Sequence, residues 1–164
     1  MKNKKVNAAR RFVLGVALLL AAMITDTATN ADYAHAGSAR LNAITRVVGL
    51  HEVKNRKTIQ AMVGVNPART PWCGAAVGYA VRKTGGKPPQ GFNKAISWKS
   101  WGKPVSLKNA QAGDVVIFRF KRGYHVALFK GMAGNGKVAA CGGNMSNRFK
   151  CSNYSARSVV AVRR

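Results

Sequence analysis

The chain has 164 residues, with 28 Lys and Arg against only four Asp and Glu, and a formal net charge of +24. This length allows one domain preceded by a leader. The shortage of carboxylates argues against a glycosidase of the lysozyme kind, which works through a carboxylate pair. The charge predicts a polyanionic partner, with a solvated surface that only confers solubility as the alternative.

Residues 1–36 have the pattern of an export signal. Lys and Arg crowd the first eleven positions, Phe12 to Ile24 is uncharged and apolar, and Ala34-His35-Ala36 resembles a cleavage site. The apolar run is shorter than the roughly 20 residues that span a bilayer. We therefore predict a domain at 37–164 in the periplasm or outside the cell. A cut at Ala31, or an uncleaved signal anchor that holds the chain at the inner membrane, are the alternatives.

The predicted mature part is more one-sided in charge than the whole chain. Five basic and two acidic residues fall in the leader, which leaves 23 basic and two acidic residues, or +21 over 128 positions. Such a field reaches about 10 Å in physiological salt. For an exported protein it predicts binding to peptidoglycan and to anionic envelope polymers rather than to nucleic acid.

The first half of the domain is predicted to be helical. Ser38 can cap a first helix, residues 54–62 form a second, and residues 72–83 form a third that stops at Gly85-Gly86. Residues 92–101 indicate a short fourth helix with an aromatic face.

The second half changes to strand periodicity. Residues 114–120 and 124–129 flank a Lys-Arg-Gly turn and predict an antiparallel hairpin, and residues 137–141 and 158–162 predict further strands. Helices followed by strands indicate an α+β fold, with the N-terminal helices packed on a small antiparallel sheet.

Cys73 is the clearest candidate for chemistry. Thr70-Pro71 stops the preceding loop and Trp72-Cys73 opens an apolar helical run, so the thiol is predicted at a helix N-terminus. Unpaired N–H groups and the helix dipole favour a thiolate there, which predicts a pKa below the ordinary value of about 8.5.

A cysteine hydrolase needs a base and a group that orients it. His125 lies in a predicted strand and would take up the thiol proton, and Asn144 at a later turn would hold the imidazole. The backbone N–H groups of Cys73 and Gly74 would stabilise the oxyanion.

The remaining cysteines, Cys141 and Cys151, flank a glycine-rich turn at residues 142–147 in a region typical of a hairpin. A disulfide between them would leave Cys73 free. The alternative is that all three thiols are small buried apolar groups.

Several blocks, in this order, resemble the CHAP and NlpC-type cysteine peptidases and amidases, over about residues 48–164: Trp72-Cys73-Gly74-Ala75-Ala76-Val77, Ala112-Gly113-Asp114-Val115-Val116-Ile117-Phe118, His125-Val126-Ala127-Leu128 and Gly142-Gly143-Asn144. They look closest to a small subgroup with W-C-A-A, P-G-D, H-V-G and G-G-N-Q blocks. The resemblance implies a papain-like fold. It also implies hydrolysis of an amide in peptidoglycan, in the stem peptide or between N-acetylmuramic acid and L-alanine.

The chain departs from that subgroup at a few positions. Gly74 and Gly78 replace an alanine and a polar or aromatic residue in the nucleophile helix. Gly142 stands where many CHAP enzymes have a glutamate, so either Asn144 orients His125 alone or another group does.

Asp114 is predicted to shape the turn into its strand, and Glu52 to stabilise the first helices or to act near the cleft. A zinc amidase is disfavoured because His51 and His125 show no helical ligand spacing, so we predict no metal and no cofactor. A monomer is expected, and the rival function is a non-catalytic basic binding module for envelope polyanions or nucleic acid.

Overall fold

The structure is a computed structural model that describes residues 31–164. Residues 34–164 form one compact unit. Most of the predicted export signal therefore lies outside the described residues, and its cleavage stays a prediction.

The helices come first in the chain, as predicted. A helix covers residues 31–45, α2 runs over Arg56–Val63, α3 over Cys73–Lys83, and a 3-10 helix over Ala95–Ser100. One expectation is wrong: Ser38 does not cap a helix, because the first helix already passes through it.

Helix α3 begins and ends where the sequence predicts. It starts at Cys73, two residues after Pro71, which cannot lie inside a helix without removing a hydrogen bond. It ends in a turn in which Gly85 has a φ of 75°. The N–H of Gly86 donates to the carbonyl of Val81, an arrangement that satisfies the last free carbonyls of a helix.

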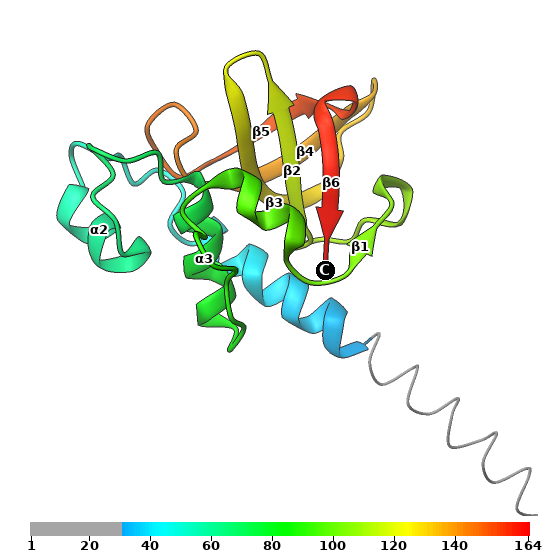
Figure 1. Ribbon diagram of the computed structural model, residues 1–164, viewed down its shortest axis with the longest axis horizontal. Helices are drawn as coiled ribbons and strands as arrows, with labels where there is room; N and C mark the ends of the chain where they lie inside the picture. The colour runs from blue at the N-terminus through cyan, green and yellow to red at the C-terminus, as the bar shows by residue number, and fades with distance from the viewer. Residues whose placement is uncertain (1–30) are drawn as a thin grey trace, which may run out of the picture. The chain divides into compact units, whose positions relative to one another are not determined.

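The strands form one six-stranded antiparallel sheet in the order β1-β6-β2-β3-β4-β5 (Figure 1). Strands β2, β3, β4 and β6 match predicted strands, whereas no range had been predicted for β1 and β5. Short 3-10 helices precede β2 and β6. The strands cover Pro104–Val105, Val115–Phe120, Gly123–Met132, Lys137–Gly142, Lys150–Ser155 and Val159–Arg163, and the 3-10 helices cover Leu107–Asn109 and Ala156–Ser158.

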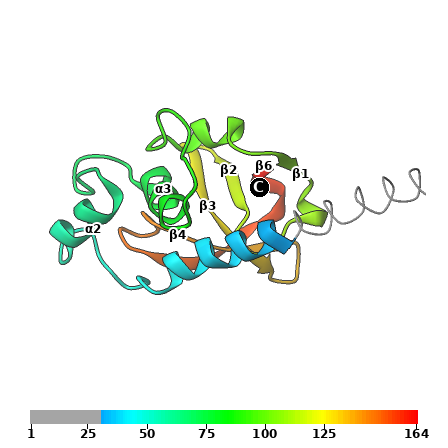
Figure 2. The same ribbon diagram turned by 90° about the horizontal axis from the view of Figure 1, so that it is seen from below.

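Helix α3 packs on β3 and β4 and against α2 (Figures 1 and 2). Nearly all of its residues are buried, which its run of small and β-branched side chains allows. The core on this face gathers side chains from the helices and from alternate strand positions, among them Ile44, Val63, Val77, Val81, Trp98, Val115, Ile117, Val126 and Leu128.

A second cluster covers the opposite face of the sheet. Because strand side chains alternate, Ala127 and Phe129 point there while Val126 and Leu128 point to α3. The other buried members are Val116, Phe118, Val138, Ala140, Met145 and Val162. The α+β architecture predicted from the sequence is thereby confirmed. Within residues 31–164 no helix combines the length and the apolar character that a membrane crossing requires.

Candidate active site

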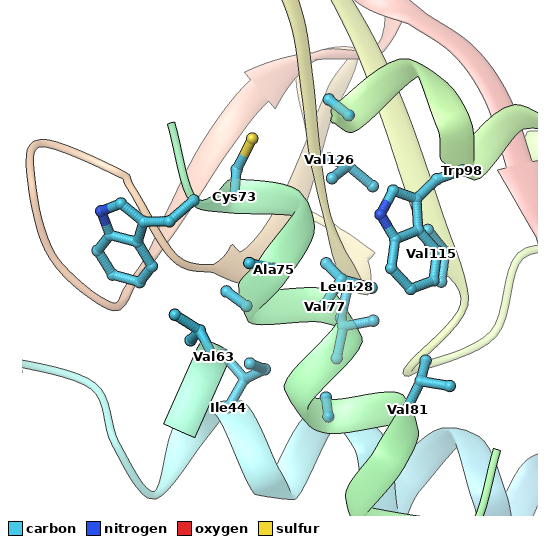
Figure 3. Close-up of a cluster of buried hydrophobic side chains, with 14 of the residues drawn as sticks. Ile44, Val63, Cys73, Ala75, Val77, Val81, Trp98, Val115, Val126 and Leu128 are labelled. Carbon is cyan, nitrogen blue, oxygen red and sulfur yellow. The ribbon is translucent and has the colours of Figure 1, made fainter. Parts of the chain in front are cut away.

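Cys73 is the first residue of α3, and its side chain is only 6% exposed. Figure 3 shows its sulfur at the N-terminal end of the helix, while Ala75, Val77 and Val81 lie further along it in the buried cluster. The sulfur can accept hydrogen bonds from the backbone N–H groups of Gly74, of Cys73 itself and of Val126 in β3. The thiol of the predicted nucleophile thus has hydrogen-bond donors on the sheet as well as on its own helix.

The pairing of the strands explains why the Val126 N–H is available. Phe129 exchanges backbone hydrogen bonds with Gly113 and Asp114, just before β2, so its N–H and C=O face β2. The backbone groups of successive strand residues face opposite neighbours, so the N–H of Val126, three positions earlier, faces β4. The β3–β4 pairing ends at Leu128 and Cys141. Because the pairing with β4 does not reach Val126, the backbone N–H of Val126 is left to donate to the Cys73 sulfur.

Burial changes the expected protonation of this thiol. Desolvation raises the pKa of Cys73, and the N–H groups of Val126, Gly74 and Cys73 oppose that rise without cancelling it. The prediction of a lowered pKa is therefore wrong for this conformation. Burial disfavours the charged thiolate, and here this effect outweighs the stabilisation that the helix N-terminus provides. The resting site holds a protonated thiol.

His125 lies at the same end of β3, directly before Val126 and opposite Phe118 of β2. Its ring stacks on Phe118, with centroids 6.3 Å apart, and lies 5.8 Å from the ring of Tyr154. Burial lowers the pKa of His125 from 6.5 to about 4. Its Nε2 is buried and has no hydrogen-bond partner within residues 31–164. A neutral imidazole with a free nitrogen is the form that can accept a proton.

Asn144 follows β4 in a turn of left-handed backbone, with a φ of 58°. Its side chain is half-buried and makes no hydrogen bond to His125 in the described part of the chain. The preceding residue has a packing reason to be glycine, since a Cβ on Gly143 would collide with the Trp72 ring and lie 2.6 Å from Ala76. The role of Asn144 as the group that orients His125 stays a prediction.

The unusual glycines of α3 allow a close approach of the following segment. A Cβ on Gly74 would meet the carbonyl oxygen of Phe92 and lie 2.7 Å from that of Asn93. A Cβ on Gly78 would lie 2.7 Å from the Phe92 ring. Glycine at these two positions therefore allows residues 92 and 93 to pack directly against α3.

Two acidic residues have structural partners. Asp114 accepts from the backbone N–H of Gln111 at 2.8 Å, and it pairs with Arg164 at 2.8 Å. It therefore shapes the turn into β2, as predicted. Glu52 accepts a 3.0 Å hydrogen bond from the indole N–H of Trp72, the residue before the nucleophile. The sequence had offered a place near the cleft only as one of two options for Glu52.

Cys141 of β4 and Cys151 of β5 are joined by a disulfide of 2.05 Å, and Cys73 is free. The bond joins the edge strand β5 to β4. Within residues 31–164, no group of three or more His, Cys, Asp or Glu side chains is placed to hold a metal ion.

A second feature lies at the other end of α3. Tyr79 and Lys83 line two adjoining surface hollows of ≈ 370 Å³ and ≈ 380 Å³. Arg46 lines the first and Arg82 the second, and no carboxylate of residues 31–164 lines either of them. The Lys83 ammonium lies 6.0 Å from the Tyr79 ring centroid, within cation–π range. Sequence reasoning missed this site because its residues come from separate helices.

No family model matches the sequence, and neither does any curated protein. Solved structures match it in fold. The hypothetical invasion protein Rv1477 of Mycobacterium tuberculosis has a TM-score of 0.53 at 16% identity, over 79% of this chain and 62% of that one. The P60 domain of the M. avium paratuberculosis antigen MAP1272c has a TM-score of 0.53 at 14% identity, over 84% and 98%.

A variant of the Resuscitation Promoting Factor Interacting protein RipA is also similar, with a TM-score of 0.54 at 16% identity over 79% of this chain and 62% of that one. The match thus spans about 62% of the length of Rv1477 and of RipA. At these identities the likeness is one of fold. The papain-like α+β fold expected from the CHAP and NlpC-type resemblance is therefore confirmed.

Proposed function

We propose that this chain is a cysteine-dependent hydrolase that cleaves an amide bond of peptidoglycan. The observation that supports the proposal is that the Cys73 sulfur lies at the backbone N–H of Val126, the residue that follows His125 in β3. The sulfur is within hydrogen-bonding reach of the Val126 N–H, one residue from a neutral imidazole whose Nε2 is unpaired in the described chain. A nucleophile and a free base in this arrangement suit attack on a carbonyl carbon.

The two residues would act in sequence. His125 takes the proton of the Cys73 thiol as the sulfur attacks the amide carbonyl, and the carbonyl π electrons move onto oxygen. The N–H groups of Cys73 and Gly74 stabilise that oxyanion. His125 then returns the proton to the leaving amine, and water hydrolyses the thioester. Since the resting thiol is protonated, proton transfer accompanies attack instead of preceding it.

Peptidoglycan is proposed as the substrate on three grounds. The Cys-His blocks resemble families that hydrolyse it, residues 1–36 have the pattern of an export signal, and the fold is shared with a P60 domain. An exported enzyme in the periplasm or outside the cell would meet this polymer. The stem-peptide bond and the muramoyl–alanine amide offer the same carbonyl chemistry, so the bond cut is left to experiment.

The positive charge gives the enzyme a way to stay on its substrate. The hollows beside Tyr79 place Arg46, Arg82 and Lys83 together with no carboxylate lining them in the described chain. We assign them to anionic envelope polymers, whose phosphates or carboxylates would displace counterions there. They lie at the C-terminal end of α3 and the thiol at the N-terminal end, so a bound polymer would leave Cys73 clear.

The rival function is a non-catalytic basic binding module. The burial of Cys73 and its raised pKa favour it, because a thiol closed off from substrate needs no reactivity. Mass spectrometry of digested sacculi separates the two functions. Wild-type protein should release fragments with one class of new amine, and Cys73→Ser should release none. Sacculus binding by both proteins, with no fragments from either, would establish the binding module.

A further inference from the structure

We propose that Arg119 binds a carboxylate of the substrate close to the bond that is cut. The Arg119 guanidinium stacks on the ring of Tyr124, and the pair lies on the sheet face that carries Cys73, beyond the start of α3. The inference rests on the proposed function, in which Cys73 is the nucleophile. It adds to that function a preference for amides that have a free carboxylate nearby.

The register of the β2–β3 hairpin brings Arg119 and Tyr124 together. The two residues are direct partners across the hairpin, so their side chains share one face of the sheet. Ile117 and Val126 stand two positions further along the same strands and belong to the buried cluster that packs on α3. Because strand side chains two positions apart point the same way, Arg119 and Tyr124 also lie on the α3 face.

The same register sets the separation between this pair and the thiol. The Cys73 sulfur is within hydrogen-bonding reach of the Val126 N–H, and both residues belong to one buried cluster (Figure 3). Tyr124 is two residues nearer the hairpin turn than Val126, which is a rise of about 7 Å along an antiparallel strand. An extended peptide covers about that length in two residues. A carboxylate about two residues from the scissile amide would therefore reach Arg119.

The surroundings of Arg119 leave its hydrogen-bond donors free for a ligand. Both side chains are exposed, Tyr124 to 40%. The guanidinium carbon lies 4.7 Å from the Tyr124 ring centroid, a cation–π contact that engages the flat side of the group. The N–H groups lie in the plane of the guanidinium and form the fork that binds a carboxylate through two hydrogen bonds. No ion pair joins Arg119 to any residue of 31–164.

The domain itself has no carboxylate to offer this arginine. Within residues 34–164 only Glu52 and Asp114 are acidic. Asp114 lies at the opposite end of β2 and pairs with Arg164, and Glu52 accepts from Trp72. The anion that suits Arg119 therefore comes from another molecule, and the stem peptides of peptidoglycan carry carboxylates. The stack on Tyr124 holds the guanidinium in place before binding, which reduces the entropy lost on binding.

The test uses sacculi stripped of phosphate polymers, either with their carboxylates intact or with these converted to neutral methylamides. The salt concentration is about 0.15 M, at which attraction beyond about 8 Å is screened. We expect Arg119→Gln to raise the apparent KM on carboxylate sacculi about tenfold with kcat little changed, because the contact is made equally in the bound substrate and in the transition state. The wild type should prefer carboxylate sacculi to methylamide sacculi, and Arg119→Gln should lose most of that preference.

Arg122→Gln is the matched control. It removes the same charge from the exposed turn three positions away, and it should keep the wild-type KM and the wild-type preference. Arg119→Lys keeps the charge without the planar fork and should recover only part of the affinity. Circular dichroism and urea unfolding confirm that each variant is folded.

Sacculus binding by Cys73→Ser measures the contact without the reaction. Adding Arg119→Gln to this variant should weaken its binding to carboxylate sacculi and leave its binding to methylamide sacculi unchanged. Equal binding with and without Arg119→Gln would overturn the inference. An equal loss from Arg122→Gln would also overturn it, since the effect would then belong to net charge. Binding that depends on Arg119, together with a wild type that cleaves no sacculi, would uphold the contact and reject the proposed hydrolase.

Discussion

The indole N–H of Trp72 donates a 3.0 Å hydrogen bond to the carboxylate of Glu52, twenty positions earlier in the chain. Trp72 is fully buried and meets the ring of Phe149 edge-on, at 4.9 Å between centroids. The residue before Cys73 is thus held by an acidic group on one side and by an aromatic ring on the other. Glu52 therefore helps to position the residue that directly precedes Cys73.

Replacing Glu52 with alanine should therefore damage both stability and activity. The buried Trp72 N–H would lose its partner, which costs about 1–3 kcal/mol of the free energy of unfolding. Glu52→Gln retains an acceptor oxygen and should lose much less. Urea unfolding and sacculus hydrolysis measure the two effects. Equal losses in both variants would show that charge, and not the hydrogen bond to Trp72, is what matters.

Gly74→Ala should destabilise the domain although alanine is the better helix former. Helix propensity alone would give a gain of about 1 kcal/mol. The new Cβ would meet the Phe92 carbonyl oxygen and lie 2.7 Å from that of Asn93, so the segment must shift, at a cost of about 2 kcal/mol or more. Gly64→Ala is unsuitable as a control because Gly64 has a φ of 80°.

Ala75→Gly supplies the matched helix-propensity comparison at the neighbouring position of α3. It should lose about 1 kcal/mol from propensity, with a further loss from the methyl group it removes from the core. Thermal unfolding of both variants is the measurement. A Gly74→Ala protein more stable than wild type would mean that residues 92 and 93 move away from α3 at no cost.

The local elements of this fold could be predicted from the sequence because their signals are local. Pro71 and Gly85 bracket α3, and two apolar runs on either side of a Lys-Arg-Gly turn mark the β2–β3 hairpin. Strand β5 has no apolar alternation, since Lys150–Ser155 is mostly polar, and it joins the sheet by pairing along its whole length with β4. The pairing of β6 with β2 likewise depends on tertiary packing and leaves no signal in the local sequence.

The sequence indicates candidate residues for the site but does not indicate the pKa values of their side chains. The spacing and order of blocks indicate Cys73 and His125, but they carry no information on burial, which raises the pKa of the thiol and lowers that of the imidazole. The local sequence around Tyr154 gives no sign that this residue lies beside His125. Its place beside His125 depends on the strand order, which is not written in any local pattern.

His125 should make the domain less stable in acid. Its folded pKa is about 4 against an ordinary 6.5, so the unfolded chain binds the proton first. Stability is therefore unaffected above pH 6.5, falls as the pH drops from 6.5 to 4, and levels off below that, by about 3 kcal/mol in total.

His125→Gln should flatten that part of the profile. The measurement is urea unfolding of both proteins at a series of pH values between 3.5 and about 7.5. Parallel curves for wild type and His125→Gln would contradict a lowered pKa for this imidazole.

Loss of the Cys141–Cys151 disulfide should lower the free energy of unfolding by about 2–3 kcal/mol, since the two residues are ten positions apart and the bond closes a short loop. The double variant Cys141→Ala/Cys151→Ala tests this in urea. Mild reductant should destabilise the wild type by a comparable amount and leave the double variant unchanged. A reductant effect that persists in the double variant would place its cause outside this bond.

Removing two charges from the hollow beside Tyr79 should weaken binding to anionic polymer more than removing two charges elsewhere. We expect Arg46→Gln/Lys83→Gln to bind inorganic polyphosphate at least about threefold more weakly than Lys121→Gln/Arg122→Gln, an equal charge change in the exposed β2–β3 turn.

Titrations at increasing salt are the measurement, and the wild-type advantage should shrink as the Debye length falls below about 8 Å. Identical affinities for the two double variants would assign polymer binding to the net charge of the domain instead of to this hollow.

The backbone of Gly37 touches that of Gly113, and a Cβ on Gly37 would lie 2.6 Å from the carbonyl oxygen of Ala112 and 3.7 Å from the Arg40 guanidinium. Proteolytic processing after Ala36 would turn this enclosed peptide nitrogen into a free ammonium group next to an arginine. In the folded domain, a cut at that bond would thus place two positive charges close together, which a cut after Ala31, further from the guanidinium along the chain, would avoid. Amino-terminal sequencing of the expressed protein would show whether the chain is cut and after which residue.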